Sequence, residues 1–299
     1  MPIPFKKKLF FIVEGILFCF VYGLLRLMPL RFSKAFCAFL LRTIGPKTGA
    51  EKIGAKNLAA AFPNYQEQER QTLLKQCWHN LGLVIGEFAH VPRLVAQPQR
   101  FTVQGLDKLE PLIKNKGGIF FAAHLGNWEI SYAPLAQKGY HINLIARVHQ
   151  NPFLNWFIEL NRNTPYVRMI SRNKKGSRAL IEAIRKKELI GALVDQYATD
   201  GAFIDFFNRP AKTTLGLARM AIKHNLPFIP VQVIRIQGTS TFKVIFHSPL
   251  AYDTTKDPKE TAEQLMIQAN QLLEQWIRQH PSQWLWLHNR WKQKPKRLA

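Results

Sequence analysis

From Phe101 onward, short apolar runs alternate with longer segments in which apolar residues recur at helical spacing. The apolar runs are predicted strands, at residues 118–123, 142–146, 190–194, 228–235 and 242–246. The segments between them are predicted helices, at residues 129–138, 152–161, 176–187, 215–224 and 260–279. Apolar strands separated by helices are typical of a sheet that is buried on both faces. The pattern therefore predicts an α/β fold with a central, mostly parallel or mixed sheet flanked by helices.

The N-terminus carries an apolar stretch of about 22 residues, Leu9–Leu30, preceded by the basic triplet Lys6–Lys8. At ~1.5 Å per residue it is roughly long enough to cross a ~30 Å hydrocarbon core. Its charged residues, Glu14 and Arg26, lie near the ends, where they can reach the interface. A buried core helix is the alternative, and a cleaved signal peptide fits poorly because no small-x-small site follows. We predict a membrane anchor at residues 1–30.

Basic residues are more numerous after this anchor than before it, which predicts that the body of the protein lies on the cytoplasmic side. In residues 31–100, Phe32, Phe36, Phe39 and Leu40 recur at helical spacing and are predicted to face the core. One domain is expected over residues 31–292, followed by a basic tail at residues 293–299.

The stretch Gly117–Ile130 is predicted to be a buried strand, then a turn, then the start of a helix. His124 falls where the strand ends, and Glu129 falls in the first turn of the helix. On one straight helix this separation is about 500° of rotation, which leaves the side chains about 140° apart. With His124 held in the preceding turn, the Glu129 carboxylate can reach back and orient the imidazole for proton transfer. The spacing also fits a glutamate that only counters the helix dipole.

Two further predicted strands are followed by a charged residue: Arg147 after residues 142–146, and Asp195 after residues 190–194. In an open α/β sheet, ligands collect at the carboxyl ends of the strands. We therefore expect His124, Arg147 and Asp195 to converge on one edge of the sheet.

The chain lacks the sequence patterns of covalent or metal-dependent catalysis. There is no Gly-x-Ser-x-Gly elbow and no cysteine near His124, so direct attack by a substrate hydroxyl is favoured over an acyl-enzyme. No His, Cys or carboxylate cluster has the spacing of metal ligands, and we expect neither a metal nor a cofactor. Arg147 and Arg162 are suited to bidentate phosphate binding, although a single arginine is more often a solvated surface charge.

The charge balance narrows the class of partner. The chain has 42 Lys+Arg against 19 Asp+Glu, a net charge of +23, which points to a polyanionic partner. That partner is nucleic acid, an anionic membrane surface or a phosphorylated substrate. No nucleic-acid-binding motif occurs and the aromatic residues lie mainly in apolar runs, so we expect no nucleic acid. The sparse cysteines, Cys19, Cys37 and Cys77, indicate a reducing compartment rather than a disulfide framework.

An ordered set of motifs runs along the chain after the N-terminal anchor. The motifs are Asn57-Leu58 with Phe62-Pro63, Ala123-His124 to Glu129, Arg147 with Asn151-Pro152, Arg162, Val194-Asp195-Gln196, Phe206–Ala211 with Thr213-Thr214-x-Gly216, and Trp286-x-His288-x-Arg290-Trp291. The set resembles the lipid A biosynthesis acyltransferases of Gram-negative bacteria, the late, lauroyl/myristoyl-type enzymes within the His-x4-Asp/Glu glycerolipid acyltransferase superfamily. The resemblance covers nearly the whole chain and includes the N-terminal anchor. Two positions depart from the family pattern: Asn163 stands where many relatives carry a second arginine, and Asn208 replaces the usual glycine.

The resemblance implies a glycerolipid-acyltransferase-like fold and an enzyme on the cytoplasmic face of the inner membrane. It implies transfer of a fatty acyl chain from acyl carrier protein to a hydroxyl of an acyl chain on a lipid A precursor. The implied partners are acyl carrier protein, that precursor and inner-membrane lipids. By motif matching, His124 is the general base and Glu129 is the catalytic carboxylate that orients it. The implied substrate-binding residues are Arg147, Arg162, Asp195 and Asn127.

Two alternatives stay open from the sequence. An acyltransferase with another acceptor, such as a lysophospholipid or a phosphatidylinositol mannoside, would carry the same His-x4-Glu motif. A non-catalytic, basic membrane-binding protein could share the fold, although it would have no use for an intact His124–Glu129 pair.

Overall fold

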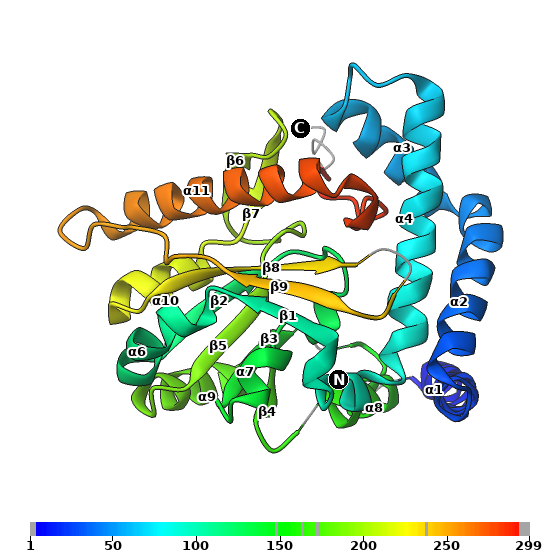
Figure 1. Cartoon of the computed structure of the whole chain (residues 1–299), viewed down its shortest axis with the longest axis horizontal. Helices are drawn as coiled ribbons and strands as arrows, with labels where there is room; N and C mark the ends of the chain where they lie inside the picture. The colour runs from blue at the N-terminus through cyan, green and yellow to red at the C-terminus, as the bar shows by residue number, and fades with distance from the viewer. Residues whose placement is uncertain (1–3, 147–148, 163, 172–173, 237–238, 293–299) are drawn as a thin grey trace.

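A seven-stranded sheet organises the part of the chain that the computed structural model describes, which is residues 4–146, 149–162, 164–171, 174–236 and 239–292 (Figure 1). The strand order is β1-β9-β8-β2-β5-β3-β4. Neighbouring strands are parallel except β8 and β9, which pair antiparallel. The strands are β1 (Phe101–Gln104), β2 (Gly118–Ala122), β3 (Ile142–Ala146), β4 (Val167–Ser171), β5 (Leu189–Leu193), β8 (Phe228–Arg235) and β9 (Phe242–Phe246). A separate antiparallel pair consists of β6 (Ala202–Asp205) and β7 (Pro210–Thr213).

The predicted α/β class is confirmed, with a mostly parallel central sheet flanked by helices. The five predicted strands are present as β2, β3, β5, β8 and β9. The four strands that the pattern did not predict are short, and they mix exposed with buried positions. Short runs of this kind lack a period strong enough to separate them from loops.

Two hydrophobic clusters cover the two faces of the sheet. One cluster packs α9, α10 and α11 over the sheet, together with parts of α3 and α4. The other packs α5, α6 and α7 over the opposite face. These helices are α3 (Gly49–Ala61), α4 (Glu67–Phe88), α5 (Val91–Val95), α6 (Leu106–Lys116), α7 (Ala133–Gln137), α9 (Lys174–Arg185), α10 (Gly216–His224) and α11 (Pro258–Gln279). Helix α8 (Pro152–Arg162) connects β3 to β4. Short 3-10 helices occupy Gly45–Lys47, Pro98–Arg100, Trp128–Ile130 and Pro281–Gln283.

Helix α2 (Leu30–Ile44) packs unusually closely against α4, as the two roughly parallel helices on the right of Figure 1 show. An added Cβ at Gly82 would lie 2.4 Å from the Cα of Ala38, and one at Gly86 would lie 2.5 Å from the Cα of Lys34. Glycines at this spacing let two helix backbones approach each other where any side chain would clash.

This packing makes the predicted core-facing stripe on α2 wrong. Phe32, Phe36, Phe39 and Leu40 are 51%, 50%, 69% and 36% exposed. The face of α2 that turns inward carries Ser33, Cys37 and Ala38, because only small side chains fit against the two glycines of α4. Helical periodicity shows that an apolar stripe exists, but it does not show whether the stripe faces the protein core or the surface.

Helix α1 (Phe5–Leu27) is long and apolar enough to cross a membrane by length and composition. The candidate segment, Lys7–Leu27, has a mean hydropathy of 2.0 and is 17% buried. The predicted N-terminal apolar helix is therefore present, and most of its surface is not covered by the rest of the protein.

Candidate active site

His124 lies in a turn just past the end of β2, beside the carboxyl end of β5. Because β2 and β5 are neighbours in the sheet, Asp195, just past the end of β5, lies next to His124. Asp195 Oδ1 lies 2.8 Å from His124 Nδ1, and Asp195 Oδ2 accepts the backbone N–H of His124 at 2.8 Å. Trp284 Nε1 donates to the same Oδ2 at 2.7 Å. The expected convergence of His124 and Asp195 on one edge of the sheet is confirmed.

The Asp195 carboxyl group is buried and ionised. Burial opposes its ionisation and is the largest single influence, but the charge of His124 and the hydrogen bonds from His124 and Trp284 together outweigh it. The net result lowers the pKa of Asp195 to about 2. A carboxylate that is charged near neutral pH and contacts Nδ1 fixes an imidazole with Nδ1 protonated and Nε2 as the basic nitrogen.

The second ring nitrogen, Nε2, contacts the side-chain amide of Gln196 at 3.1 Å. The backbone that carries Asp195 and Gln196 is held from the C-terminal motif. Arg290 is fully buried and donates to the carbonyls of Gln196 and Lys212 and to Thr213 Oγ1. Burial lowers the pKa of Arg290 to about 10, with Asp195 opposing the shift. The motif residue Asn57 donates to the carbonyls of Trp286 and His288. Arg290 and Asn57 thus fix the backbone around the site through the hydrogen bonds of their buried side chains.

Glu129 contacts Arg162 rather than the imidazole. Its two carboxylate oxygens accept from Arg162 Nε at 2.8 Å and Nη2 at 2.6 Å, and Trp128 Nε1 adds a third bond at 3.1 Å. Arg162 is largely buried, which disfavours its charge, but Glu129 outweighs this and raises the pKa of Arg162 overall. In the described residues, the carboxylate that contacts Nδ1 of His124 comes from Asp195, so the geometry differs from the expected His124–Glu129 hydrogen bond. The cause is local: a 3-10 turn at Trp128–Ile130 replaces the expected helix start, and α8 lies where Glu129 points.

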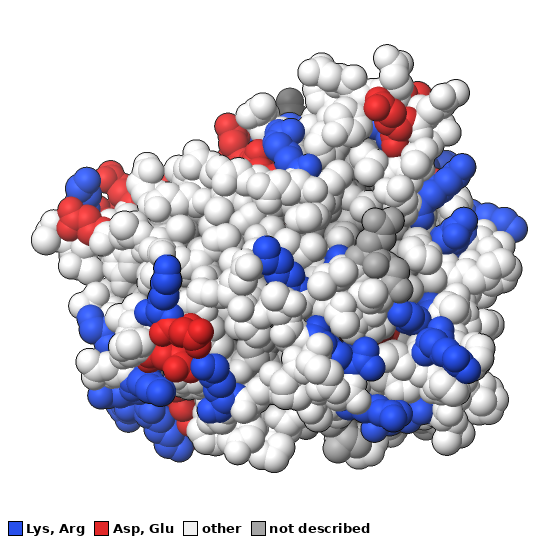
Figure 2. All heavy atoms as spheres, viewed as in Figure 1, with Lys and Arg blue, Asp and Glu red and all other residues white. Residues whose placement is uncertain are grey.

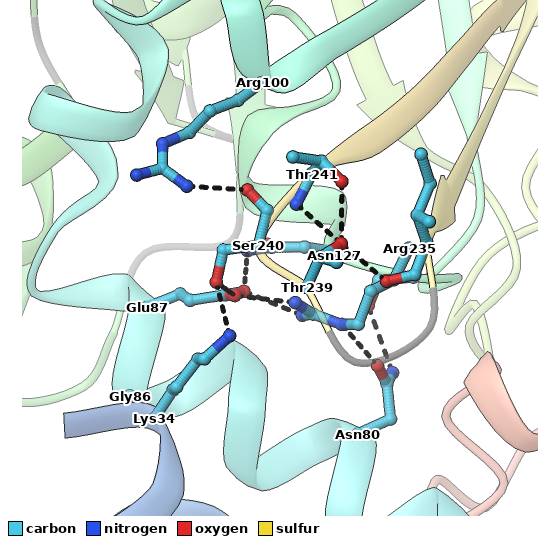
Figure 3. Close-up of polar contacts among 12 residues, drawn as sticks. Lys34, Asn80, Gly86, Glu87, Arg100, Asn127, Arg235, Thr239, Ser240 and Thr241 are labelled. Carbon is cyan, nitrogen blue, oxygen red and sulfur yellow. Dashed lines mark hydrogen bonds and ion pairs between the residues drawn. The ribbon is translucent and has the colours of Figure 1, made fainter. Parts of the chain in front are cut away.

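The turn between His124 and Glu129 rests on a buried ionic cluster (Figure 3). Asn127 Oδ1 accepts the backbone N–H of Glu129 at 3.1 Å, and Asn127 Nδ2 donates to Glu87 Oε2 at 2.8 Å. Glu87 in turn forms a bidentate pair with Arg235 at 2.6 and 2.7 Å and accepts from Ser240. Glu87 and Asn127 are 0% exposed. Asn127 was expected to bind substrate, but its amide is occupied on both sides inside the protein.

The same cluster fixes the preceding residue of the turn. Asn80 Nδ2 donates to the carbonyls of Gly126 and Gln283, while Arg235 Nε donates to Asn80 Oδ1. Gly126 adopts a positive φ of 62°, and a Cβ there would lie 2.6 Å from the carbonyl oxygen of Val233. Only glycine fits this combination of conformation and close approach.

A cavity of about 470 Å³ is lined by the polar site residues and by strands of the sheet. His124, Glu129 and Arg162 supply its polar wall. Its apolar wall includes Phe120, Tyr132, Leu135, Ile142, Leu144 and Leu193. The volume is within the usual range for small-molecule sites, which combine an apolar lining with a few convergent polar groups.

The structure brings four of the predicted site residues together in one region: His124, Glu129, Arg162 and Asp195. Arg147 lies outside the described residues. Glu87, Arg235 and Trp284 were missed, because each joins the site from an element distant in the chain. A glutamate within the mainly apolar inward face of α4, where Asn80 is also buried, was the available signal for Glu87. No cluster of His, Cys, Asp or Glu suited to a metal ion occurs in the part of the chain that the structure covers.

The sequence is similar to known proteins along nearly its whole length. Residues 3–293 match the family model described as bacterial lipid A biosynthesis acyltransferase. The chain belongs to this family. It is therefore an acyltransferase, and its position in the family agrees with the resemblance carried by the sequence motifs.

Individual family members are similar over most of their length. The lipid A biosynthesis palmitoleoyltransferase of Escherichia coli K12 is 26% identical over 253 residues, which is 82% of this chain and 79% of that protein. The lipid A biosynthesis lauroyltransferase of the same organism is 26% identical over 257 residues, covering 82% and 80%. A lipid A biosynthesis acyltransferase of Haemophilus influenzae is 27% identical over 286 residues, covering 93% and 87%. Because these relatives are named for different acyl groups, the similarity does not assign a chain length to this enzyme.

Proposed function

We propose that this enzyme transfers a fatty acyl chain from acyl carrier protein to a hydroxyl group on an acyl chain of a lipid A precursor. The observation that carries the proposal is the His124–Asp195 pair, in which His124 lines the same cavity as the Glu129–Arg162 pair. The net charge of +23 supports it as well, because an acidic carrier protein, a phosphorylated lipid and an anionic leaflet are all negatively charged.

His124 acts as the general base in this mechanism. With Nδ1–H donated to Asp195, Nε2 takes the proton of the acceptor hydroxyl while the hydroxyl oxygen attacks the thioester carbonyl carbon. The new C–O bond forms, the C–S bond breaks, and the imidazolium returns its proton to the departing thiolate. The products are an ester and the free carrier thiol. General-base catalysis of this kind contributes about 10²–10⁴-fold to the rate.

Glu129 remains a catalytic residue in the proposal, but it acts through its pairing with Arg162. Glu129 occupies Nε and Nη2 of the guanidinium, so among the described residues Nη1 is the nitrogen left to contact a substrate oxygen. A fixed, charged donor beside the reacting atoms stabilises negative charge that develops in the transition state. We propose Arg147 as a further substrate-binding residue, and Asp195 and Asn127 as groups that position His124 and Glu129.

The test combines the purified full-length enzyme with an acyl carrier protein thioester and one of two acceptors, a lipid A precursor or a lysophospholipid. We expect free carrier thiol and a product heavier by one acyl group only with the lipid A precursor. Product formation only with the lysophospholipid would identify the other class of acceptor. Carrier release with neither acceptor would support the non-catalytic alternative. The lipid A mass spectrum of a deletion strain checks the assignment in cells and should lack one acyl chain.

A further inference from the structure

Helix α1 is docked along the body of the protein over most of its length. The side chains that face the body are Phe11, Gly15, Phe18, Tyr22 and Leu25. They repeat every three or four residues and so form one stripe along the helix. The rest of the helix surface is exposed and apolar, with Ile16, Leu17 and Phe20 each more than 60% exposed.

The partner of this stripe is α8, which runs alongside α1 in the same direction. At one end, Asn151 Nδ2 donates to the Phe11 carbonyl at 2.9 Å and to Glu14 Oε2 at 2.8 Å. At the other end, the Tyr22 hydroxyl donates to Asn161 Oδ1 at 2.7 Å. Between them, the Tyr22 ring packs edge-on against Phe157, with 4.5 Å between the ring centroids.

These contacts are incompatible with α1 crossing a bilayer. The docked segment from Phe11 to Arg26 is about 22 Å long at ~1.5 Å per residue, and it ends where Arg26 donates to the carbonyl of Ala89. A crossing of ~30 Å would carry α8 into the hydrocarbon with it. Helix α8 joins β3 to β4 and ends in Arg162, so it cannot cross the hydrocarbon core together with α1. Within the described helix, Phe5–Phe10 precedes the docked stripe and is about 9 Å long.

Helix α2 adds a second exposed apolar face next to α1. Phe32, Phe36 and Phe39 are 51%, 50% and 69% exposed and lie within about 60° of one another around the helix. The side of α2 that packs on α4 is fixed by glycine contacts and by the hydrogen bond from Ser33 Oγ to the Gly86 carbonyl at 2.7 Å. The phenylalanine face therefore cannot rotate inward.

The two helices form one continuous surface. Figure 1 shows α1 nearly end-on at the foot of α2, so the axes of both helices run along the same side of the molecule. On α8, Phe153 and Trp156 extend this surface and are 51% and 61% exposed. Apolar surface of this extent is rare on proteins that are free in water, and it marks an interaction site. Lys and Arg side chains line the same side, over α2 and α4 (Figure 2).

We propose that α1 and α2 lie together in the plane of one membrane leaflet, so that the enzyme is monotopic and neither helix crosses the bilayer. The occupant of the surface is an anionic phospholipid bilayer, with the exposed apolar side chains ~5–10 Å deep at the boundary of headgroups and acyl chains. The exposed cations Arg31 and Arg42 on α2 and Lys7 and Lys8 on α1 then face lipid phosphates. This placement brings α8, and with it Arg162, to the membrane surface. It does not depend on the acyl-transfer chemistry.

Labelling from each side of the membrane tests the position of α1. In full-length protein carrying Cys19→Ser, one accessible cysteine is introduced as Lys7→Cys or, as the matched control on the body, Thr254→Cys. Both original residues are exposed, and the remaining Cys37 and Cys77 are buried. A membrane-impermeant maleimide is applied to inverted inner-membrane vesicles and to spheroplasts. We expect both positions to react in the same preparation. Reaction of Lys7→Cys from the opposite side, or from neither side, would overturn the proposal.

Lipid quenching tests α2 independently. A fluorophore is attached to Phe39→Cys or to Ile181→Cys in the Cys19→Ser protein, and the protein is reconstituted into phosphatidylethanolamine/phosphatidylglycerol vesicles with brominated acyl chains. Ile181 is the control because it is also an exposed apolar residue, 47% exposed, but lies on α9. We expect most of the fluorescence at position 39 to be quenched and that at position 181 to be retained. Equal quenching at both positions would rule out an inserted α2 face.

Discussion

Asp195 contacts His124 twice, accepting the backbone N–H on Oδ2 and lying against Nδ1 with Oδ1, both at 2.8 Å. One carboxylate thereby fixes both the path of the turn and the orientation of the ring that it carries. The two residues follow adjacent parallel strands, so the register of β2 with β5 sets their distance. The register of the sheet thus sets the distance between the proposed base and the carboxylate that orients it.

Asp195→Asn should leave the protein folded and nearly inactive. The asparagine NH₂ group facing Nδ1 would favour the tautomer with the proton on Nε2, where the base is needed. We expect kcat to fall by about 10²–10⁴-fold, the usual contribution of a general base. Asp205→Asn is the matched control because Asp205 is exposed on β6, and it should keep wild-type kcat. Steady-state assays measure kcat and circular dichroism checks the fold of both variants. Wild-type kcat in Asp195→Asn would show that the His124–Asp195 pair has no part in the mechanism.

The same carboxylate should make stability depend on acid pH. Its folded pKa of about 2 lies below the value of 3.8 for the free side chain. The contribution of ionised Asp195 to the free energy of unfolding is therefore fully present above the unfolded pKa and is lost as the pH falls through the folded pKa. The difference between the two pKa values corresponds to about 2 kcal/mol of that free energy. Denaturant unfolding at pH values from about 5 down to about 2 should show this loss, whereas Asp195→Asn should lack that share of the pH dependence. Parallel curves for the two proteins would contradict the prediction.

Glu129 and Arg162 should behave as one functional unit. Glu129→Gln weakens the pair, and Arg162→Lys keeps the charge while losing the planar fork that contacts both carboxylate oxygens. We expect each single change to lower kcat/KM by at least about tenfold, and the double change to cost little more than the worse single one. Arg185→Lys, at an exposed position on α9, controls for the substitution type and should have no effect. Strictly additive losses in the cycle would show that the residues act separately.

The buried pair Glu87–Arg235 should be a large contributor to stability. Replacing Glu87 with alanine leaves the Arg235 charge, which is 4% exposed, without its partner. Removing one member of a buried pair typically costs about 3–5 kcal/mol. Glu182→Ala breaks the exposed pair with Lys186 and should cost less than about 1 kcal/mol. Urea unfolding of both variants compares their losses in free energy of unfolding. Similar midpoints would mean that Glu87 is not essential to the fold.

Asn127 separates the role of this cluster in catalysis from its role in stability. Asn127→Ala removes the acceptor for the Glu129 N–H and the donor to Glu87. If the cluster positions the turn, kcat should fall while KM for the carrier thioester changes little. A loss confined to stability, with kcat unchanged in the folded fraction, would assign Asn127 a purely structural role.

The sequence predicted the parts of this site that one strand or one motif carries. His124, Asp195 and the strands before them follow from apolar runs that end in charged residues. The partner of Glu129 did not follow, because the choice between His124 and Arg162 depends on where α8 packs. The outward face of α2 was missed for a related reason: its orientation is set by Gly82 and Gly86 on another helix. Periodicity defines the faces of an element, and tertiary packing decides what each face contacts.

The last prediction concerns acyl-chain length and rests on Gly191. This glycine lies in the middle of β5, in register with Phe120 and Leu144 on the neighbouring strands, and all three line the cavity. Phe120 lies on β2, four residues before His124 in the chain, which places this level of the sheet at most about 13 Å from the turn that carries His124, at ~3.3 Å per residue. The absence of a side chain at Gly191 therefore leaves room at the distance that the tail of an acyl chain would reach.

Gly191→Val should narrow the cavity at this level and leave His124 and Asp195 in place. An added Cβ lies 2.8 Å from Leu144 Cδ2, the end of a flexible side chain that can move into the cavity. Thioesters with long chains should lose the contact that their terminal carbons make, whereas shorter chains should fit as before. We expect the ratio of kcat/KM for tetradecanoyl over decanoyl carrier protein to fall by roughly tenfold, since a lost contact of about 1.4 kcal/mol has that effect. An unchanged ratio, with both activities intact, would place the acyl tail elsewhere than along β5.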